Sequence, residues 1–236
     1  MVGKFYRSLQ EAVNAKRKLL AILIDPEKFR ISEIDTFLAK IPKDTTHLFV
    51  GGSTVLNGET EIVVQNLKQK TQLPIFLFPG DYSQITNLAD ALLFLSLISG
   101  RNSEYLIGQQ VKSITKLRKS PLEIISTSYI LIDGGNDSSI SKVTQTTPLP
   151  QNNIQTIVDT VMAGQYLGAK LIYLEAGSGA KFPVNPEIIS EVKKEIKIPL
   201  IVGGGIRTEQ QKQLAYRAGA DMIVMGTIFE NSEFPH

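Results

Sequence analysis

Glycine-rich segments follow three of the apolar stretches in the chain. They are Glu175-Ala-Gly-Ser-Gly179, Gly203-Gly-Gly205 and Gly226-Thr227. Glycine leaves backbone N–H groups uncovered, and near the start of a helix such groups bind phosphate through hydrogen bonds and the helix dipole. Glycines also allow tight turns between strands and helices, which is the alternative explanation. Because three such segments occur in succession, we predict that together they bind a phosphate group.

A single carboxylate, Asp25, closes the first apolar stretch, and the second stretch ends in Gly51-Gly-Ser-Thr54. A lone carboxylate suits Mg²⁺, which keeps several waters and takes one or two protein oxygens together with substrate phosphates. Ser53 or Thr54 would supply the second oxygen. The alternative is that Asp25 only stabilises the turn at Pro26. The position of Asp25 favours the metal site.

Glu175 and Tyr173 lie on one apolar stretch that runs into the glycines. A carboxylate at this point is a candidate general base, and an ion pair with Lys181 is the alternative. Tyr173 alternates with Leu174 and could point inward, where its aromatic face would stabilise a cation. A strand tyrosine is more often part of the core, so both interpretations of Tyr173 stay open on the residues alone.

The composition excludes several other chemistries. The 236 residues include no Cys, which rules out a disulfide scaffold, an Fe–S cluster and a Cys nucleophile. His47 lies near the start of an apolar stretch and His236 is the last residue, so neither is a good catalytic candidate. No Lys ends an apolar stretch, which disfavours a Schiff-base aldolase. The formal net charge of +2 gives no broad basic surface for a nucleic acid.

No segment predicts residence in a membrane. The most apolar stretch, Ala89–Ile98, contains Asp90 and has about half of the roughly 20 residues that a spanning helix needs. Residues 1–10 do not resemble a signal peptide. No linker divides the chain, so we expect a single domain over residues 1–236. The absence of Cys suits a reducing cytosol, so we expect a cytoplasmic protein.

Eight apolar stretches have the length of strands and lack clean alternation, as in parallel strands that helices cover on both faces. They are Leu19–Ile24, His47–Val50, Pro74–Phe78, Ala91–Leu95, Leu122–Ile125, Lys170–Leu174, Ile198–Val202 and Asp221–Met225. Helical patterns lie between most of them, at Tyr6–Asn14, Ser32–Ala39, Thr60–Gln69, Ser103–Lys119, Asn152–Leu167, Pro186–Ile196 and Thr208–Gly219. This alternation predicts a TIM (β/α)₈ barrel, whose chemistry sits at the C-terminal ends of the strands. A doubly wound open sheet is the alternative.

Two segments depart from the alternation. Only 12 residues, Pro79 to Asp90, separate the third and fourth strands, too few for a full crossover helix, so we expect a barrel that lacks a regular third helix. Apolar residues around the gap, among them Phe78 and Leu95, would then form an open groove along one side of the barrel. The polar stretch Asp133–Gln151 is predicted to be a long loop at the same end as the site, where long loops are usually functional.

These residues together resemble the geranylgeranylglyceryl phosphate synthase family, which includes the heptaprenylglyceryl phosphate synthases. The resemblance runs from about Leu19 to Phe229. It rests on Leu23-Ile-Asp-Pro-Glu-Lys28, Val50-Gly-Gly-Ser53, Phe78-Pro-Gly80, Ser96-Leu-Ile-Ser-Gly-Arg-Asn102, Tyr173-Leu-Glu-Ala-Gly-Ser-Gly179, Val202-Gly-Gly-Gly-Ile206 and Met225-Gly-Thr227. Tyr-Leu-Glu-Ala-Gly-Ser-Gly is specific, whereas glycine-rich strand ends occur in many barrels.

The resemblance implies a modified TIM barrel and a transferase that joins a prenyl group, carried on its diphosphate, to the sn-3 hydroxyl of sn-glycerol 1-phosphate. Asp25 and Ser53 would hold Mg²⁺ at the diphosphate. Glu175 would deprotonate the attacking hydroxyl, and Tyr173 would face the developing allylic cation. The residues implied to bind glycerol phosphate are Tyr173, Leu174, Glu175, Ala176, Gly177, Ser178, Gly179, Gly204, Gly205, Gly226 and Thr227.

Three features resemble the archaeal and Bacteroidetes-type group of this family. Some bacterial members carry Lys two residues before the aspartate, where this chain has Leu23. The long stretch Asp133–Gln151 and the Glu-Ala-Gly-Ser form point the same way. The group implies a geranylgeranyl donor and a homo-oligomer, and a lipid donor and product imply transient contact with a membrane surface.

Two other functions fit part of the pattern. A sugar-phosphate isomerase or cyclase of the barrel type would use Asp25 and Glu175 as an acid–base pair, but an apolar groove would be superfluous beside a small polar substrate. A non-catalytic scaffold that binds a phosphorylated ligand would tolerate the loss of both carboxylates.

Overall fold

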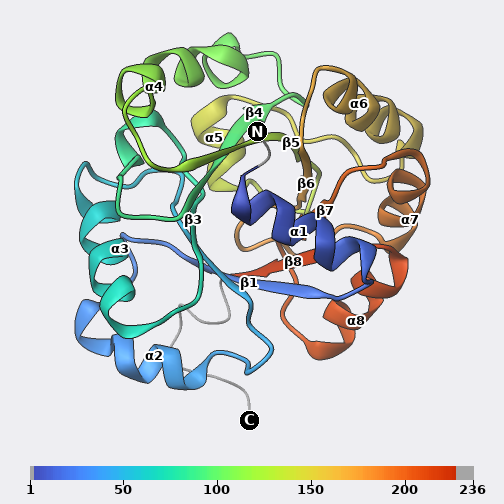
Figure 1. Ribbon diagram of the computed structural model, residues 1–236. Helices are drawn as coiled ribbons and strands as arrows, with labels where there is room; N and C mark the ends of the chain where they lie inside the picture. The colour runs from blue at the N-terminus through green and yellow to red at the C-terminus, as the bar shows by residue number, and fades with distance from the viewer. Residues whose placement is uncertain (1–2, 227–236) are drawn as a thin grey trace.

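The computed structural model describes residues 3–226, in which eight parallel strands close into a barrel (Figure 1). The barrel closes because β1 pairs with β8, as in Leu19 opposite Met222, so the alternative of an open sheet is wrong. The strands are β1 (Leu19–Ile24), β2 (His47–Val50), β3 (Ile75–Leu77), β4 (Ala91–Leu97), β5 (Glu123–Leu131), β6 (Leu171–Glu175), β7 (Leu200–Gly203) and β8 (Met222–Met225).

Helices surround the barrel and one crosses its end. They are α1 (Lys4–Asn14), α2 (Ile34–Lys40), α3 (Glu59–Lys70), α4 (Gln109–Leu117), α5 (Ser139–Thr144), α6 (Ile154–Tyr166), α7 (Pro186–Glu195) and α8 (Glu209–Ala218). A capping box begins α8: the Thr208 side chain accepts from the backbone N–H of Gln211, and the Gln211 side chain accepts from the backbone N–H of Thr208. Within residues 3–226, none of the helices has both the length and the apolarity needed to cross a bilayer.

The connection from β3 to β4 carries only a 3₁₀ turn, Tyr82–Gln84, where a third crossover helix would normally lie. This confirms the expected gap in the ring of helices. Two hydrogen bonds connect this turn to α4. The backbone N–H of Tyr82 donates to Gln109 Oε1 at 2.9 Å, and Lys116 Nζ donates to the carbonyl of Ser83 at 3.1 Å.

Strand β5 is longer than predicted. The expected strand ended at Ile125, but pairing with β4 and β6 continues to Leu131 through three small polar residues. Ser128 faces α6, where a side chain on Gly164 would come within 2.3 Å of its Oγ. Small residues are therefore needed on this strand so that the helix can approach, and they hid the strand from a search for apolar stretches.

The predicted loop Asp133–Gln151 contains a short helix, α5, and a bridge that pairs Ile132 with Leu149. The prediction of an unbroken loop was therefore wrong. Ser138 caps the helix, because its side chain accepts from the backbone N–H of Ser141 at 3.3 Å. Six polar and β-branched residues are too few to show a helical period, so the sequence pattern could not reveal this element.

Two apolar layers hold the barrel together, one inside it and one between the strands and the helices. Alternate residues of each strand divide between the layers, so that Tyr173 packs inside the barrel while Leu174 packs against the helices. Tyr173 therefore points into the barrel, and this position is compatible with both interpretations, a core residue and a residue that stabilises a cation. This alternation also directs the last inward residue of each strand to the C-terminal mouth.

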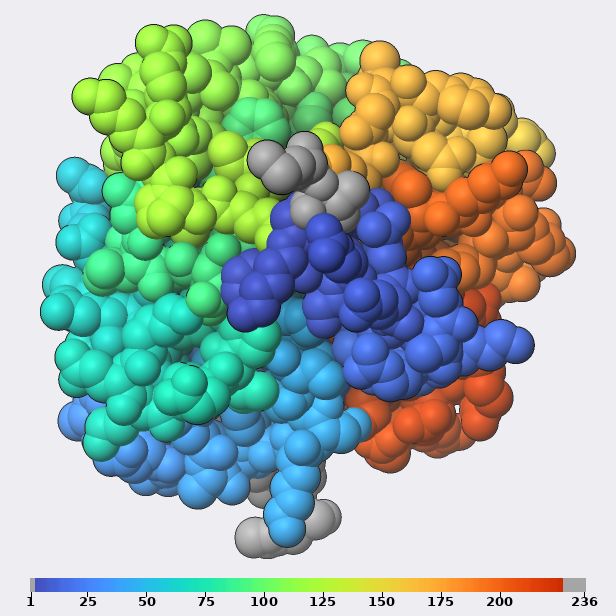
Figure 2. Space-filling view, viewed as in Figure 1, coloured from blue at the N-terminus to red at the C-terminus, as the bar shows by residue number. Residues whose placement is uncertain are grey.

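Helix α1 closes the opposite end of the barrel, where Figure 2 shows it seated across the face. Its residues Tyr6, Leu9 and Ala12 are buried with the interior side chains. Glu123, at the start of β5, accepts hydrogen bonds from the backbone N–H groups of Phe5 at 2.7 Å and Tyr6 at 2.8 Å. These two donors belong to the first turn of the helix, whose N–H groups have no partner within the helix.

The two hydrogen bonds from α1 to Glu123 form a clamp between this helix and β5. Removing the clamp should destabilise the whole barrel without changing the pocket at the opposite end. We expect Glu123→Ala to lower the free energy of unfolding by about 2–3 kcal/mol, because two helix N–H groups lose a charged acceptor. Urea denaturation would measure it. Glu33→Ala, which removes an exposed carboxylate paired with Arg30, is the matched control and should change little. Equal stabilities for the two variants would contradict the proposed clamp.

Candidate functional site

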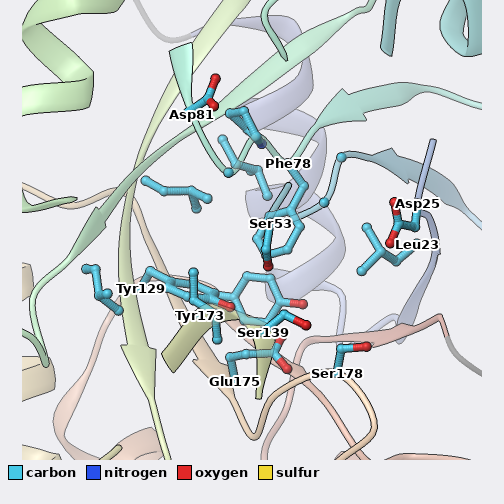
Figure 3. Close-up of a pocket in the computed structure, with 18 of the residues that line it drawn as sticks. Leu23, Asp25, Ser53, Phe78, Asp81, Tyr129, Ser139, Tyr173, Glu175 and Ser178 are labelled. Carbon is cyan, nitrogen blue, oxygen red and sulfur yellow. The ribbon is translucent and has the colours of Figure 1, made fainter. Parts of the chain in front are cut away.

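One pocket opens at the C-terminal mouth of the barrel, and the strand ends supply its walls (Figure 3). Asp25 follows β1, Ser53 follows β2, Phe78 follows β3 and Glu175 ends β6. Segments that are far apart in the sequence therefore meet around one space. This is the arrangement that the barrel topology predicts for a catalytic site.

Glu175 is a buried carboxylate, 6% exposed, and the backbone N–H of Gly177 donates to its Oε1 at 2.7 Å. Burial raises the pKa of Glu175 to about 7, and the Gly177 hydrogen bond opposes this rise. No ion pair involving Glu175 is present among the described residues, so the alternative of a pair with Lys181 is not formed. A carboxylate tuned in this way can accept a proton near neutral pH.

Tyr173 lies beside Glu175 and is completely buried. Its hydroxyl makes no hydrogen bond within the described part of the chain, and burial together with the Glu175 charge raises the pKa of the phenol well above its usual value. The ring stacks on Phe78 with centroids 5.1 Å apart and meets the edge of Tyr129 at 5.3 Å. Three aromatic rings thus border the space next to the carboxylate.

Gly203 and Gly204 leave room for the side chains of Tyr173 and Glu175, in addition to any role in binding a phosphate. A Cβ on Gly203 would lie 2.4 Å from the Tyr173 hydroxyl, and one on Gly204 would lie 2.4 Å from Glu175 Oε1. Gly204 also has a φ of +81°, which side-chain-bearing residues rarely adopt. The end of β7 can therefore press directly against the carboxylate.

The predicted phosphate segments reach the pocket only in part. Ser178, Gly204, Gly205 and Gly226 line it, and the backbone N–H groups of the first three donate no hydrogen bond within the described residues. The N–H of Gly177 is already taken by Glu175. The other predicted contacts lie off the pocket wall or outside the described residues: Leu174 packs in the helix layer, Ala176 and Gly179 do not line the pocket, and Thr227 lies outside the described part.

Asp25 and Ser53 face the pocket from the other side. Asp25 Oδ1 lies against the backbone of Gly52, since a Cβ there would be 2.8 Å away, and Ser53, the next residue along the chain, also lines the pocket. The expected turn is also present, because Oδ1 accepts from the N–H of Glu27 at 3.2 Å. Thr54 is engaged elsewhere, donating to Glu27 at 3.0 Å, which favours Ser53 as the second oxygen.

This donor set suits an ion that takes few protein ligands. Within residues 3–226 no three His, Cys, Asp or Glu side chains come together to cage a metal. One carboxylate and one hydroxyl at a pocket wall are what Mg²⁺ needs when water and substrate phosphate complete its coordination. The residues present therefore fit a magnesium ion bound together with a phosphorylated substrate.

The predicted apolar groove continues from the mouth towards the gap in the helix ring. Phe78, Leu93, Leu95 and Tyr105 line it, together with Ile85, which follows the 3₁₀ turn. Polar groups at the mouth and apolar groups in the groove belong to one continuous pocket. A ligand that fits both parts has a charged head and an apolar tail.

Sequence reasoning missed three side chains that line the pocket: Lys28, Tyr129 and Arg207. Tyr129 was hidden because β5 was predicted to end too early, although Ile125, Thr127 and Tyr129 do alternate. Arg207 Nη2 donates to the carbonyl of Ala180 at 2.7 Å and so fastens the loop after β7 to the loop after β6. The available signal was the position of Arg207, two residues after the glycine-rich segment Gly203-Gly-Gly205.

The α5 segment forms a further wall. Ser139 and Ile140 line the pocket, and a Cβ on Gly177 would lie 2.6 Å from the side chain of Ser138. The long stretch that the sequence placed at this end therefore packs directly on the segment that holds Glu175.

Comparison with known proteins gives consistent matches. A model described as the PcrB family matches residues 12–235. Geranylgeranylglyceryl phosphate synthases of Zunongwangia profunda and Flavobacterium johnsoniae are 52% and 51% identical, covering 98% and 96% of this chain and 99% and 93% of their own. The crystal structure of (S)-3-O-geranylgeranylglyceryl phosphate synthase from Thermoplasma acidophilum, in complex with sn-glycerol-1-phosphate, has a TM-score of 0.86 and 34% identity, covering 96% of this chain and 92% of that one.

The buried carboxylate makes a prediction about stability. Because the pKa of Glu175 is raised to about 7 in the folded state, the folded protein binds more protons than the unfolded chain between pH 4.5 and 7. This group therefore lowers stability progressively as the pH rises through that range. We expect Glu175→Gln to match the wild type below about pH 4.5 and to be more stable by up to about 3 kcal/mol above pH 7.

Urea denaturation at a series of pH values would test this prediction. Glu187→Gln, at an exposed position in α7, is the control for loss of one negative charge. A stability difference between Glu175→Gln and the wild type that does not vary with pH would show that the carboxylate is not buried as described.

Proposed function

The chain belongs to the PcrB family and is a prenyltransferase, and from this we propose that it joins a prenyl group to the sn-3 hydroxyl of sn-glycerol 1-phosphate. The prenyl donor is a diphosphate and the product is an ether-lipid precursor. The observation that carries the proposal is the single pocket that connects a buried carboxylate and phosphate-type glycines with an apolar groove.

We propose that glycerol phosphate binds at the end formed by β6, β7 and β8. Within residues 3–226 the N–H groups of Ser178, Gly204 and Gly205 donate to no protein acceptor, so they are the natural donors to a phosphate. The relative from Thermoplasma acidophilum was solved with sn-glycerol-1-phosphate, which supports this choice of acceptor. In this arrangement the N–H of Gly177 donates to Glu175, and the N–H groups of Ser178, Gly204 and Gly205 donate to the phosphate.

Glu175 is the proposed general base. Its carboxylate takes the proton of the sn-3 hydroxyl as that oxygen forms a bond to the first carbon of the prenyl chain. The bond between that carbon and the diphosphate breaks, and the diphosphate leaves with the electron pair. The ring faces of Tyr173, Phe78 and Tyr129 border the place where positive charge grows on the allylic carbon, and aromatic faces attract cations.

Asp25 and Ser53 are the proposed ligands of Mg²⁺. When bound, the ion would neutralise the charge that accumulates on the leaving diphosphate. Two observations support this role: both residues line the pocket, and Thr54, the other candidate hydroxyl, is engaged with Glu27.

The apolar groove separates this proposal from the alternatives. A sugar-phosphate isomerase or cyclase has no use for the wall formed by Leu93, Leu95 and Tyr105. For the donor we propose geranylgeranyl diphosphate, the group named in the relatives from Zunongwangia profunda and Flavobacterium johnsoniae. A homo-oligomer, a cytoplasmic location and transient contact with a membrane surface, through which lipid substrate and product would pass, belong to the same proposal.

The catalytic assignment is tested with purified protein, Mg²⁺, sn-glycerol 1-phosphate and prenyl diphosphates of several lengths. We expect an ether product, with kcat/KM rising as the pH rises through about 7, because Glu175 must be ionised to act as a base. Glu175→Gln should lose about 10²–10⁴-fold in kcat, and Asp25→Ala should require far more Mg²⁺.

Product formation is followed by separating the ether lipid from its donor. No product with any donor would refute the synthase assignment, and a non-catalytic scaffold would then be the better explanation. Full activity in either variant would refute the role given to that residue.

The groove predicts a separate effect on the donor. Leu95→Asp places a charge on the apolar wall, so KM for the prenyl diphosphate should rise about 10-fold or more while binding of glycerol phosphate stays the same. Steady-state kinetics with each substrate varied in turn would measure both. Leu56→Asp, at an exposed position outside the pocket, is the control, and equal changes in both KM values would contradict a dedicated groove.

A further inference from the structure

Lys28 lies beside the proposed metal site and has no part in the reaction as described above. Its Nζ is 3.2 Å from Asp25 Oδ2, so the side chain pairs with the carboxylate that would bind Mg²⁺. The two residues lie on one turn, in which the backbone N–H of Lys28 donates to the carbonyl of Asp25 at 3.1 Å. The Lys28 side chain is 49% exposed, whereas that of Asp25 is 17% exposed, so the lysine is the more solvent-accessible member of the pair.

The charges of the pocket make this lysine important. Among the described residues that line it, four carry carboxylates, namely Asp25, Glu27, Asp81 and Glu175. The cationic lining residues of that same set are Lys28 and Arg207. Arg207 is tied to the carbonyl of Ala180, on the side of the pocket assigned to glycerol phosphate. Lys28 is therefore the cation placed to meet a diphosphate on the side of β1 and β2.

One carboxylate cannot keep both a lysine and a divalent cation at close range without repulsion between the two cations. Lysine has a flexible stem and a compact charge, so it can change partners by rotation of its own side chain. A lysine displaced from Asp25 remains at the pocket wall, where a diphosphate bound to the same metal would offer it new oxygen acceptors.

We propose that Lys28 exchanges partners during binding: it neutralises Asp25 in the free enzyme and turns to the diphosphate once Mg²⁺ occupies the carboxylate. The inference rests on the proposed function and deepens it. It gives Lys28 two opposite effects: the lysine weakens the binding of Mg²⁺ to Asp25, and it strengthens the binding of the diphosphate. A residue that only stabilised the turn would have neither.

Isothermal titration calorimetry on the full chain tests the two roles separately. The first titration uses Mg²⁺ alone, and the second uses inorganic pyrophosphate in the presence of Mg²⁺. We expect Lys28→Met to bind Mg²⁺ alone roughly 2–5-fold more tightly, because an exposed competing pair is lost. The same variant should bind pyrophosphate roughly 10-fold more weakly, because a charge-assisted hydrogen bond is lost.

Two further variants serve as controls. Lys28→Arg keeps the charge and should bind pyrophosphate close to the wild-type level. Lys70→Met removes a similarly exposed lysine whose Nζ lies 2.9 Å from Asp35 Oδ2 outside the pocket, and it should change neither titration. Thermal unfolding of each variant would verify that the fold is intact.

The outcomes separate this inference from the proposed function. Failure of the wild type to bind pyrophosphate with Mg²⁺ would count against the proposed function and take the inference with it. Normal binding by the wild type, with unchanged pyrophosphate affinity in Lys28→Met, would overturn the exchange alone. So would weaker binding of Mg²⁺ alone in that variant, since it would show that Lys28 supports the turn and does not compete with the metal.

Discussion

Burial of the Glu175 carboxylate is the constraint around which the mouth of this barrel is built. Burying an ionised carboxylate is unfavourable unless hydrogen bonds or cations compensate it, and the compensation here is one backbone N–H, from Gly177. Gly203 and Gly204 have no room for a Cβ, so β7 lies directly against the carboxylate and against Tyr173. Gly203 and Gly204 therefore help to bury the carboxylate, and burial raises its pKa. Under the proposed function, the same stretch of backbone would also offer N–H groups to a phosphate, which would link proton transfer and substrate binding.

The absence of a crossover helix between β3 and β4 shapes the apolar part of the pocket. A crossover helix would cover the outer faces of these strands, but the short connection leaves Phe94 half-buried and lets the pocket extend outwards past Ile85. The 3₁₀ turn is kept in place by hydrogen bonds to α4, so the gap is a rigid feature of the fold. An apolar surface of this shape is stable in water only if it is narrow or usually filled. A prenyl chain bound in the groove would fill it.

Much of the fold follows from local rules that the sequence displays. The bounds of β1 and β2 were predicted to the residue because their side chains are apolar on both faces, and Asp25, Ser53 and Glu175 then fall at one mouth by topology. The rest depends on contacts between distant segments. Ser128 is small because α6 approaches it, which concealed the strand that carries Tyr129. The sequence also could not show that the Gly177 N–H is committed to Glu175, because that depends on how one loop turns.

Charge balance connects the two ends of the pocket. The described lining residues offer four carboxylates against two cations, yet each proposed substrate is an anion. Glu175 lessens this conflict because its pKa of about 7 keeps it partly protonated near neutral pH. Asp25, by contrast, is paired with a cation. Lys28 supplies one in the free protein, and a divalent ion that arrives with the diphosphate would supply more charge and release the lysine. Under the proposed function, positive charge would enter the pocket with one of the two negatively charged substrates, which would link the binding of the metal to the binding of the donor.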